Sequence, residues 1–288
     1  MAANLETCKS TGHLRSTSLP SSSHPLTTSV EEQLVHLRSS EATPSASLIS
    51  QKLGGLKHLY DRVEDWLQLP LTQETLSKQN HGRGTDDLLE RSLRSLDICG
   101  VLREVLSLTK ERLGDLESSL RRKSCVDSAS AEDIIDCYLT SRKKTRKIIS
   151  QTCKTLRKMN PRHVVNQVSP EEATLNLLTG VDMASISVFE SLACFLSRPR
   201  DRSNRWNSVK KVLSSKQVLC EDAGEVDQLD IELLALRSGC RDINAQLHDL
   251  QKKVEALESS ISEMEEVSGS IFRCLVKARV SILNCLNN

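Results

Sequence analysis

The sequence predicts an all-α protein, an elongated helical bundle that follows a Ser/Thr/Pro-rich N-terminal tail. The first observation is compositional. Leu is the most frequent apolar residue, and aromatic residues make up only 2% of the 288 residues, whereas pleated sheets favour aromatic and β-branched side chains. The second is periodicity, since apolar residues recur every three or four positions along most of the chain, as in helices that bury one face.

The beginning of the chain differs from the rest. Residues 1–27 are rich in Ser, Thr and Pro and show no apolar period, so we expect a disordered tail. Thr28 and Glu31 then form a capping box, which predicts the start of the first helix. We therefore predict a tail over residues 1–27 and a single helical-bundle domain over residues 28–288.

Proline and serine residues mark the following helix boundaries. Pro44 predicts the start of a second helix, because proline is tolerated in a first turn, and Pro70 predicts its end. Ser169, Pro170 and Glu172 combine an N-cap, a first-turn proline and an acidic third residue, which predicts another helix start. These signals and the apolar period predict helices near residues 28–37, 44–69, 72–80, 85–123, 130–160, 169–197 and 206–213.

The strongest periodic signal lies at the C-terminal end. From Leu229 to Cys285, alternating steps of four and three residues meet an apolar residue at every position except Ser268. A period of 3.5 residues predicts coiled-coil-like packing. We expect one continuous helix of roughly 85 Å, at 1.5 Å per residue. Its apolar seam is expected to pack on the chain's own upstream helices, with a homodimeric coiled coil as the alternative.

Composition also limits compartment and partners. Ten cysteines lie at irregular spacing without a CxxC pair, and the chain has no N-x-Ser/Thr sequon. Both facts favour a reducing compartment, so we expect an intracellular protein of the cytoplasm or nucleus, with plastid targeting as an alternative. The most apolar window, residues 175–196, contains Asp182 and Glu190, which makes it a poor candidate for a membrane-spanning helix.

A basic stretch from Arg121 to Arg162 contains twelve Lys or Arg residues. The candidate basic surface is its densest cluster, which comprises Arg142, Lys143, Lys144, Arg146 and Lys147. Such a cluster is typical of proteins that bind anionic lipid or of nuclear-import patches. Only one aromatic residue, Tyr138, accompanies the charge, so we expect no nucleic-acid binding. A peripheral membrane protein that binds anionic lipid through residues 142–158 is the alternative function.

A structural interpretation of the same stretch is favoured. Residues 221–267 carry thirteen acids against four bases, although the whole chain has a net charge of only +1. Charge patterns of opposite sign help helices to select their neighbours in a bundle. We therefore expect a basic helix of the stretch to lie beside an acidic helix.

The tail contains a candidate phosphorylation switch at Ser18. Arg15 lies three residues before this serine and Pro20 two residues after it, a pattern that 14-3-3 proteins bind once the serine is phosphorylated. The phosphate adds nearly two negative charges and three acceptor oxygens, which arginines of the 14-3-3 protein can bind. We expect protein partners, with 14-3-3 proteins the candidates for this site, although a Ser-rich tail also produces such matches by composition.

The sequence shows no catalytic pattern. The seven histidines are scattered, without an HExxH pair or a Cys/His cluster at zinc spacing. The glycine-rich residues 81–84 lack the pattern of a phosphate-binding loop and are interpreted as a turn. We expect a non-enzymatic interaction or regulatory protein without a metal or cofactor.

Short motifs follow one another over nearly the whole chain. They are RSTSLPS at residues 15–21, LGGLKHLY at 53–60, LQLPLTQ at 67–73, LDIC at 96–99, KERL at 110–113, LESSLRRK at 116–123, LESSI at 257–261 and IFRCLVKARVSILN at 271–284. These motifs resemble the plant-specific family known as domain of unknown function 241, which is grouped with the BYPASS-type developmental proteins. Cys274 and Ala278 depart from the family pattern, which has a basic residue and a Thr there. The resemblance implies an all-helical fold and a role in root and shoot development, and it supplies no catalytic residue.

Overall fold

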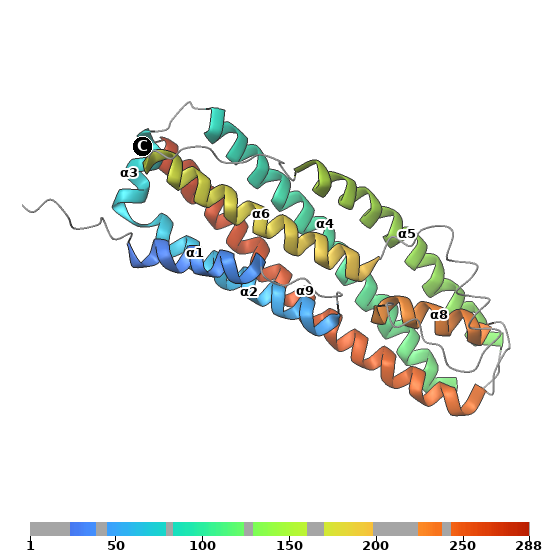
Figure 1. The fold of residues 1–288 in the computed structure, drawn as a ribbon. Coiled ribbons are helices and arrows are strands. Elements are labelled where there is room, and N and C mark those ends of the chain that lie inside the picture. The colour runs from blue at the N-terminus through green and yellow to red at the C-terminus, as the bar shows by residue number, and fades with distance from the viewer. Residues whose placement is uncertain are drawn as a thin grey trace, which may run out of the picture.

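A computed structural model describes residues 24–38, 45–78, 83–123, 129–159, 170–197, 224–237 and 243–287. Within these ranges every regular element is an α-helix, which confirms the predicted all-α class. The long helices lie side by side along one axis and form an elongated bundle (Figure 1). The helices are α1 (Pro25–Arg38), α2 (Ala46–Leu67), α3 (Pro70–Lys78), α4 (Arg83–Lys123), α5 (Ala129–Met159), α6 (Pro170–Leu196), α8 (Glu225–Arg237) and α9 (Ile243–Asn287).

Helix α9 packs chiefly on α4 and α2, which lie on either side of it. It runs antiparallel to α4, because Cys99 Sγ donates to the backbone oxygen of Ser268 while Arg279, further along α9, donates to the earlier Ser92. It runs parallel to α2, where Ser50 bonds Glu263 and Glu64 bonds Lys277. Helix α6 covers α2 and α4, and α5 packs on α4 and α6.

The predicted seam of α9 is buried. From Leu250 to Cys285 none of the seam positions exceeds 8% exposure, and even the polar Ser268 is only 2% exposed. Because α9 packs on α2 and α4 of the same chain, the expected intramolecular packing of the seam is confirmed.

The expectation of one continuous helix from residue 229 to residue 285 is wrong. Lys253 Nζ of α9 lies 2.6 Å from Glu232 Oε1 of α8, although the two residues are 21 positions apart. A straight helix would separate them by roughly 32 Å, so the chain reverses between α8 and α9, and Figure 1 shows α8 lying beside the first part of α9. The reversal lets α8 bury Leu229 and Leu233 against the bundle.

Some helix starts also differ from the prediction. Helix α1 begins at Pro25, one turn before the capping box at Thr28, because the ring nitrogen of His24 accepts a hydrogen bond of 3.2 Å from the Leu26 amide. Pro25 then occupies a first-turn position, where its missing N–H is harmless. Helix α2 is capped by Ser45, whose side chain accepts from the Leu48 amide. Helix α3 starts at Pro70 rather than Thr72, whereas the helix expected near residues 206–213 lies outside the described ranges.

One helix of the described residues, Ala173–Leu196, is long and apolar enough by composition to cross a membrane, with a mean hydropathy of 1.4. In the bundle, 61% of its most apolar window is buried. Asp182 in its middle pairs with Arg91 at 2.8 Å and accepts a 2.6 Å hydrogen bond from Ser95. Burial together with an internal ion pair is what a core helix of a bundle shows.

Candidate functional site

Helix α5 has two distinct faces. Its buried positions recur every three or four residues and point into the bundle, among them Ile135, Tyr138, Ile149 and Leu156. This spacing places the side chains between them on the opposite face, towards solvent. The helix ends at Met159, before Pro161.

The structure divides the predicted basic cluster between these faces. Lys143, Lys144 and Lys147 are exposed, as expected of a surface. Arg142 is instead only 3% exposed, and Arg146 is half-buried. The prediction that these two arginines belong to an open basic surface is therefore wrong, because both point towards α8.

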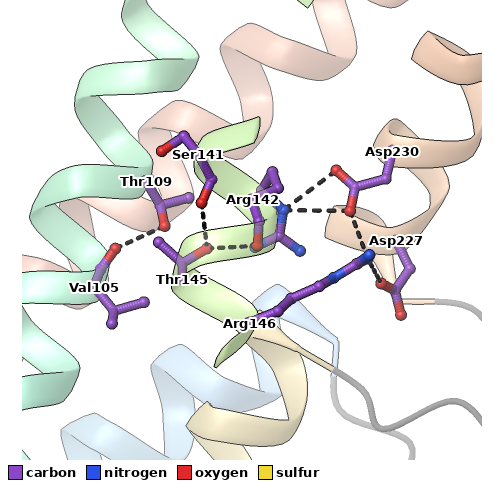
Figure 2. A network of polar contacts seen from close by, with 8 residues as sticks. All are labelled: Val105, Thr109, Ser141, Arg142, Thr145, Arg146, Asp227 and Asp230. Carbon is purple, nitrogen blue, oxygen red and sulfur yellow. Dashed lines mark hydrogen bonds and ion pairs between the residues drawn. The ribbon is translucent and has the colours of Figure 1, made fainter. Parts of the chain in front are cut away.

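The two arginines meet two aspartates of α8 (Figure 2). Arg142 Nε donates to both carboxylate oxygens of Asp230 at 3.2 Å. Arg146 Nη2 lies 2.8 Å from Asp227 Oδ1 and 2.6 Å from Asp230 Oδ2, so it bridges both acids. This cluster confirms that a basic helix lies beside an acidic helix inside the bundle. We call it the α5–α8 ion-pair cluster.

The α5–α8 ion-pair cluster is largely removed from water. The side chains of Arg142 and Asp230 are 4% and 6% exposed. Burial is the largest single influence on the Arg142 guanidinium and lowers its pKa, but the contributions of Asp230, Tyr138 and Asp227 together outweigh burial and the net pKa is raised. Burial, followed by the charge of Asp230, raises the pKa of the nearby Tyr138 hydroxyl. The arginine therefore stays charged and the tyrosine stays neutral at physiological pH.

Several buried donors in the α5–α8 ion-pair cluster have no acceptor among the described residues. They are Nη1 and Nη2 of Arg142 and Nε of Arg146. Most buried polar groups in proteins are hydrogen-bonded. The α5–α8 contact therefore satisfies the charges of the arginines but only part of their hydrogen-bonding capacity.

The outer face of α5 carries exposed bases that we call the α5 ridge. It consists of Lys143, Lys144, Lys147, Lys154, Arg157 and Lys158. No acidic residue occurs on α5 after Asp136, and Ile148, which is 39% exposed, lies at the edge of the ridge, one turn after Lys144. The first and last base, Lys143 and Lys158, are 15 positions apart, which corresponds to roughly 23 Å of helix.

None of the ridge bases forms an ion pair with another residue in the part of the chain that the structure describes. Lys154, Arg157 and Lys158 were not among the predicted site residues. Helical spacing is the signal for them, because Lys143, Lys147, Lys154 and Lys158 follow the i, i+4, i+11, i+15 pattern of one face.

The phosphorylation motif of the tail and the question of a metal site remain to be placed on the structure. Arg15, Ser18 and Pro20 lie outside the described ranges, so the phosphorylation switch stays a prediction. Within those ranges no group of three or more His, Cys, Asp or Glu side chains is arranged to hold a metal ion.

The fold and the α5 ridge define the class of protein as an all-helical bundle with a basic face open to solvent. The family model described as Protein BPS1 matches residues 52–285, and the chain belongs to this family of BYPASS-type plant developmental regulators, which is a non-enzymatic family. No curated protein and no solved structure matches the chain. The family match agrees with the resemblance seen in the sequence motifs.

Proposed function

We propose that the protein is a non-enzymatic regulator of root and shoot development that acts by binding, and that the α5 ridge docks it on an anionic membrane surface. The observation that carries the proposal is the contrast between the two faces of α5. Arg142 and Arg146 are neutralised by α8, whereas the six ridge bases face solvent without an acidic partner among the described residues.

The composition of the ridge favours a bilayer over a protein partner. Five of its six bases are lysines, which act as mobile point charges, and no aromatic residue is among them. Protein interfaces usually centre on Trp, Tyr or Arg. Each Lys or Arg near an anionic leaflet contributes about 1 kcal/mol, so the α5 ridge supplies up to about 6 kcal/mol. Ile148 offers an apolar contact at the edge of the ridge, one turn after Lys144.

Vesicle sedimentation tests this function with a matched pair of variants. Lys144→Glu/Lys147→Glu reverses two ridge charges, and Arg62→Glu/Lys252→Glu reverses two exposed charges on α2 and α9. We expect the wild type to bind phosphatidylserine vesicles at about 0.05 M salt and to lose binding at about 0.5 M. The ridge variant should bind at least about tenfold more weakly, while the control variant keeps its affinity.

Several results would contradict membrane docking. They are equal affinity for neutral phosphatidylcholine vesicles, equal losses in the two variants, or no binding at low salt by the wild type and by Asp227→Asn/Asp230→Asn, which lacks the carboxylates that hold Arg142 and Arg146. Salt-dependent binding of an acidic protein without any vesicle binding would assign the α5 ridge to a protein partner instead.

A second mode of binding is suggested by the tail. We propose that phosphorylated Ser18, with Arg15 and Pro20, binds 14-3-3 proteins. An affinity pull-down from plant extract with phosphatase inhibitors should recover 14-3-3 proteins with the wild type and with Ser16→Ala, but not with Ser18→Ala. Recovery with all three proteins, or with none, would refute this mode and leave the α5 ridge proposal unaffected.

A further inference from the structure

We propose that α8 is an internal acidic competitor for the basic face of α5. While α8 is docked it holds Arg142 and Arg146, and its release adds both arginines to the α5 ridge. The proposal rests on the membrane-docking function above and names how that same site is regulated.

The charge of α8 suits this role. The helix has four acids, Glu225, Asp227, Asp230 and Glu232, against the single base Arg237. Asp227 and Asp230 are both 6% exposed and accept from the two arginines. Carboxylates held by arginines occupy the same donors that a lipid phosphate would use. Docked α8 therefore withholds two cations from the surface.

The polar fit of the docked state is incomplete. Nη1 and Nη2 of Arg142 and Nε of Arg146 are buried without an acceptor in the described part of the chain. Buried donors that lack acceptors, and the removal of charges from water, both weigh against the docked state. The cluster thus holds α8 less firmly than the short ion-pair distances alone suggest.

The packing of α8 is also limited. The helix has 13 residues, and isolated helices of this length are marginal in water. It packs chiefly against α5 and α9, at the outside of the bundle (Figure 1). Val226, Leu229 and Leu233 are its buried apolar anchors. Peripheral elements with few anchors open locally without unfolding the rest of a protein, and here the contacts of α9 with α2 and with α4 do not depend on α8.

Release of α8 is coupled to membrane binding by linkage. Two additional arginines at an anionic surface correspond to about 30-fold tighter binding of the released form. Because coupling between sites is reciprocal, anionic lipid then favours release of α8 by the same factor.

Hydrogen exchange of the wild-type protein tests the competitor directly. On addition of phosphatidylserine vesicles, we expect the amides of α8 to exchange faster, while those of α2 and α4 keep their protection. Neutral phosphatidylcholine vesicles should leave α8 unchanged. Protection of α8 that stays the same on bound anionic vesicles would overturn the proposal and leave membrane docking intact.

A matched pair of variants gives a second measurement. Asp227→Asn/Asp230→Asn removes the two negative charges that hold the arginines, and Glu255→Gln/Glu266→Gln makes the same charge change at exposed positions of α9. We expect the first variant to bind anionic vesicles about tenfold more tightly than the second. Equal affinities of the two variants would contradict the proposal that α8 competes for the basic face of α5. If the first variant does not fold, the hydrogen-exchange experiment alone tests the proposal.

The remaining outcomes separate this proposal from the function on which it rests. Binding by the Asn variant alone would support the competitor and restrict docking to the released form. Absence of binding by the wild type and both variants would refute membrane docking, and the competitor with it.

Discussion

Ser95 Oγ on α4 donates a hydrogen bond of 2.6 Å to Asp182 Oδ1 on α6, and both side chains are buried. Arg91 pairs with the other carboxylate oxygen of Asp182 at 2.8 Å. Together Ser95 and Arg91 provide hydrogen-bond donors for a carboxylate in the interior of the bundle. They also join α4 to the most apolar helix of the chain.

Two buried serines should respond differently to the same substitution. Ser95→Ala removes a hydrogen bond to a buried carboxylate, so we expect a loss of about 1–3 kcal/mol in the free energy of unfolding. The Ser268 hydroxyl has no hydrogen-bond partner among the described residues, and Ala is the better helix former. Ser268→Ala should therefore be neutral or stabilise by up to about 1 kcal/mol. Urea unfolding followed by circular dichroism measures both, and equal losses would contradict the assignment.

Adjacent glycines of α2 provide a second matched comparison. A Cβ at Gly54 would meet nothing within 4 Å, whereas one at Gly55 would lie 2.9 Å from Leu37 Cδ2 of α1. Gly54→Ala should stabilise the protein by about 0.5–1 kcal/mol through helix propensity. Gly55→Ala should gain less or lose stability, because the Leu37 side chain must move out of its packed position. The same thermal or urea unfolding assay applies, and a larger gain for Gly55→Ala would argue against the close packing of α1.

Two cysteines should differ in alkylation rate. Burial raises the pKa of the Cys99 thiol to about 12, an effect only partly offset by Arg103, whereas Cys137 is exposed on α5. Because the thiolate is the reactive form, Cys99 should resist iodoacetamide at pH 8 in the native protein while Cys137 reacts. Peptide mass spectrometry reads both sites, and in urea the two should react alike. Rapid native labelling of Cys99 would mean that the α4–α9 contact opens readily.

The oligomeric state follows from the position of the α9 seam. Its residues are already buried against α2 and α4, so we expect light scattering to give a monomer of 32.1 kDa. A dimer that dissociates on substitution of Ile261, which is 0% exposed, would revive the homodimeric coiled coil.

Much of the fold could be predicted from local signals. Apolar spacing and proline positions predicted helices close to those observed, because helix formation depends on contacts within a few residues. The α1 start was missed, since the ring of His24 and first-turn Pro25 compete with the capping box at Thr28. The two basic residues assigned to an open surface were misplaced for another reason, because burial depends on which helix lies opposite.

The sequence by itself determined the helical class, the buried seam of α9 and the presence of opposite charge blocks, because these follow from residue type and spacing along one chain. Only the tertiary structure decided that the chain reverses between α8 and α9. The reversal in turn decides which basic residues of α5 form ion pairs with α8 and which face solvent. The 3.5-residue apolar period continues without interruption from α8 into α9 and therefore gives no sign of the reversal. Leu229 and Leu250 look equivalent in the sequence. The fold back of α8 places Asp230 against Arg142 and leaves Lys143 and Lys147 in solvent, because neighbours on one helix point to different sides.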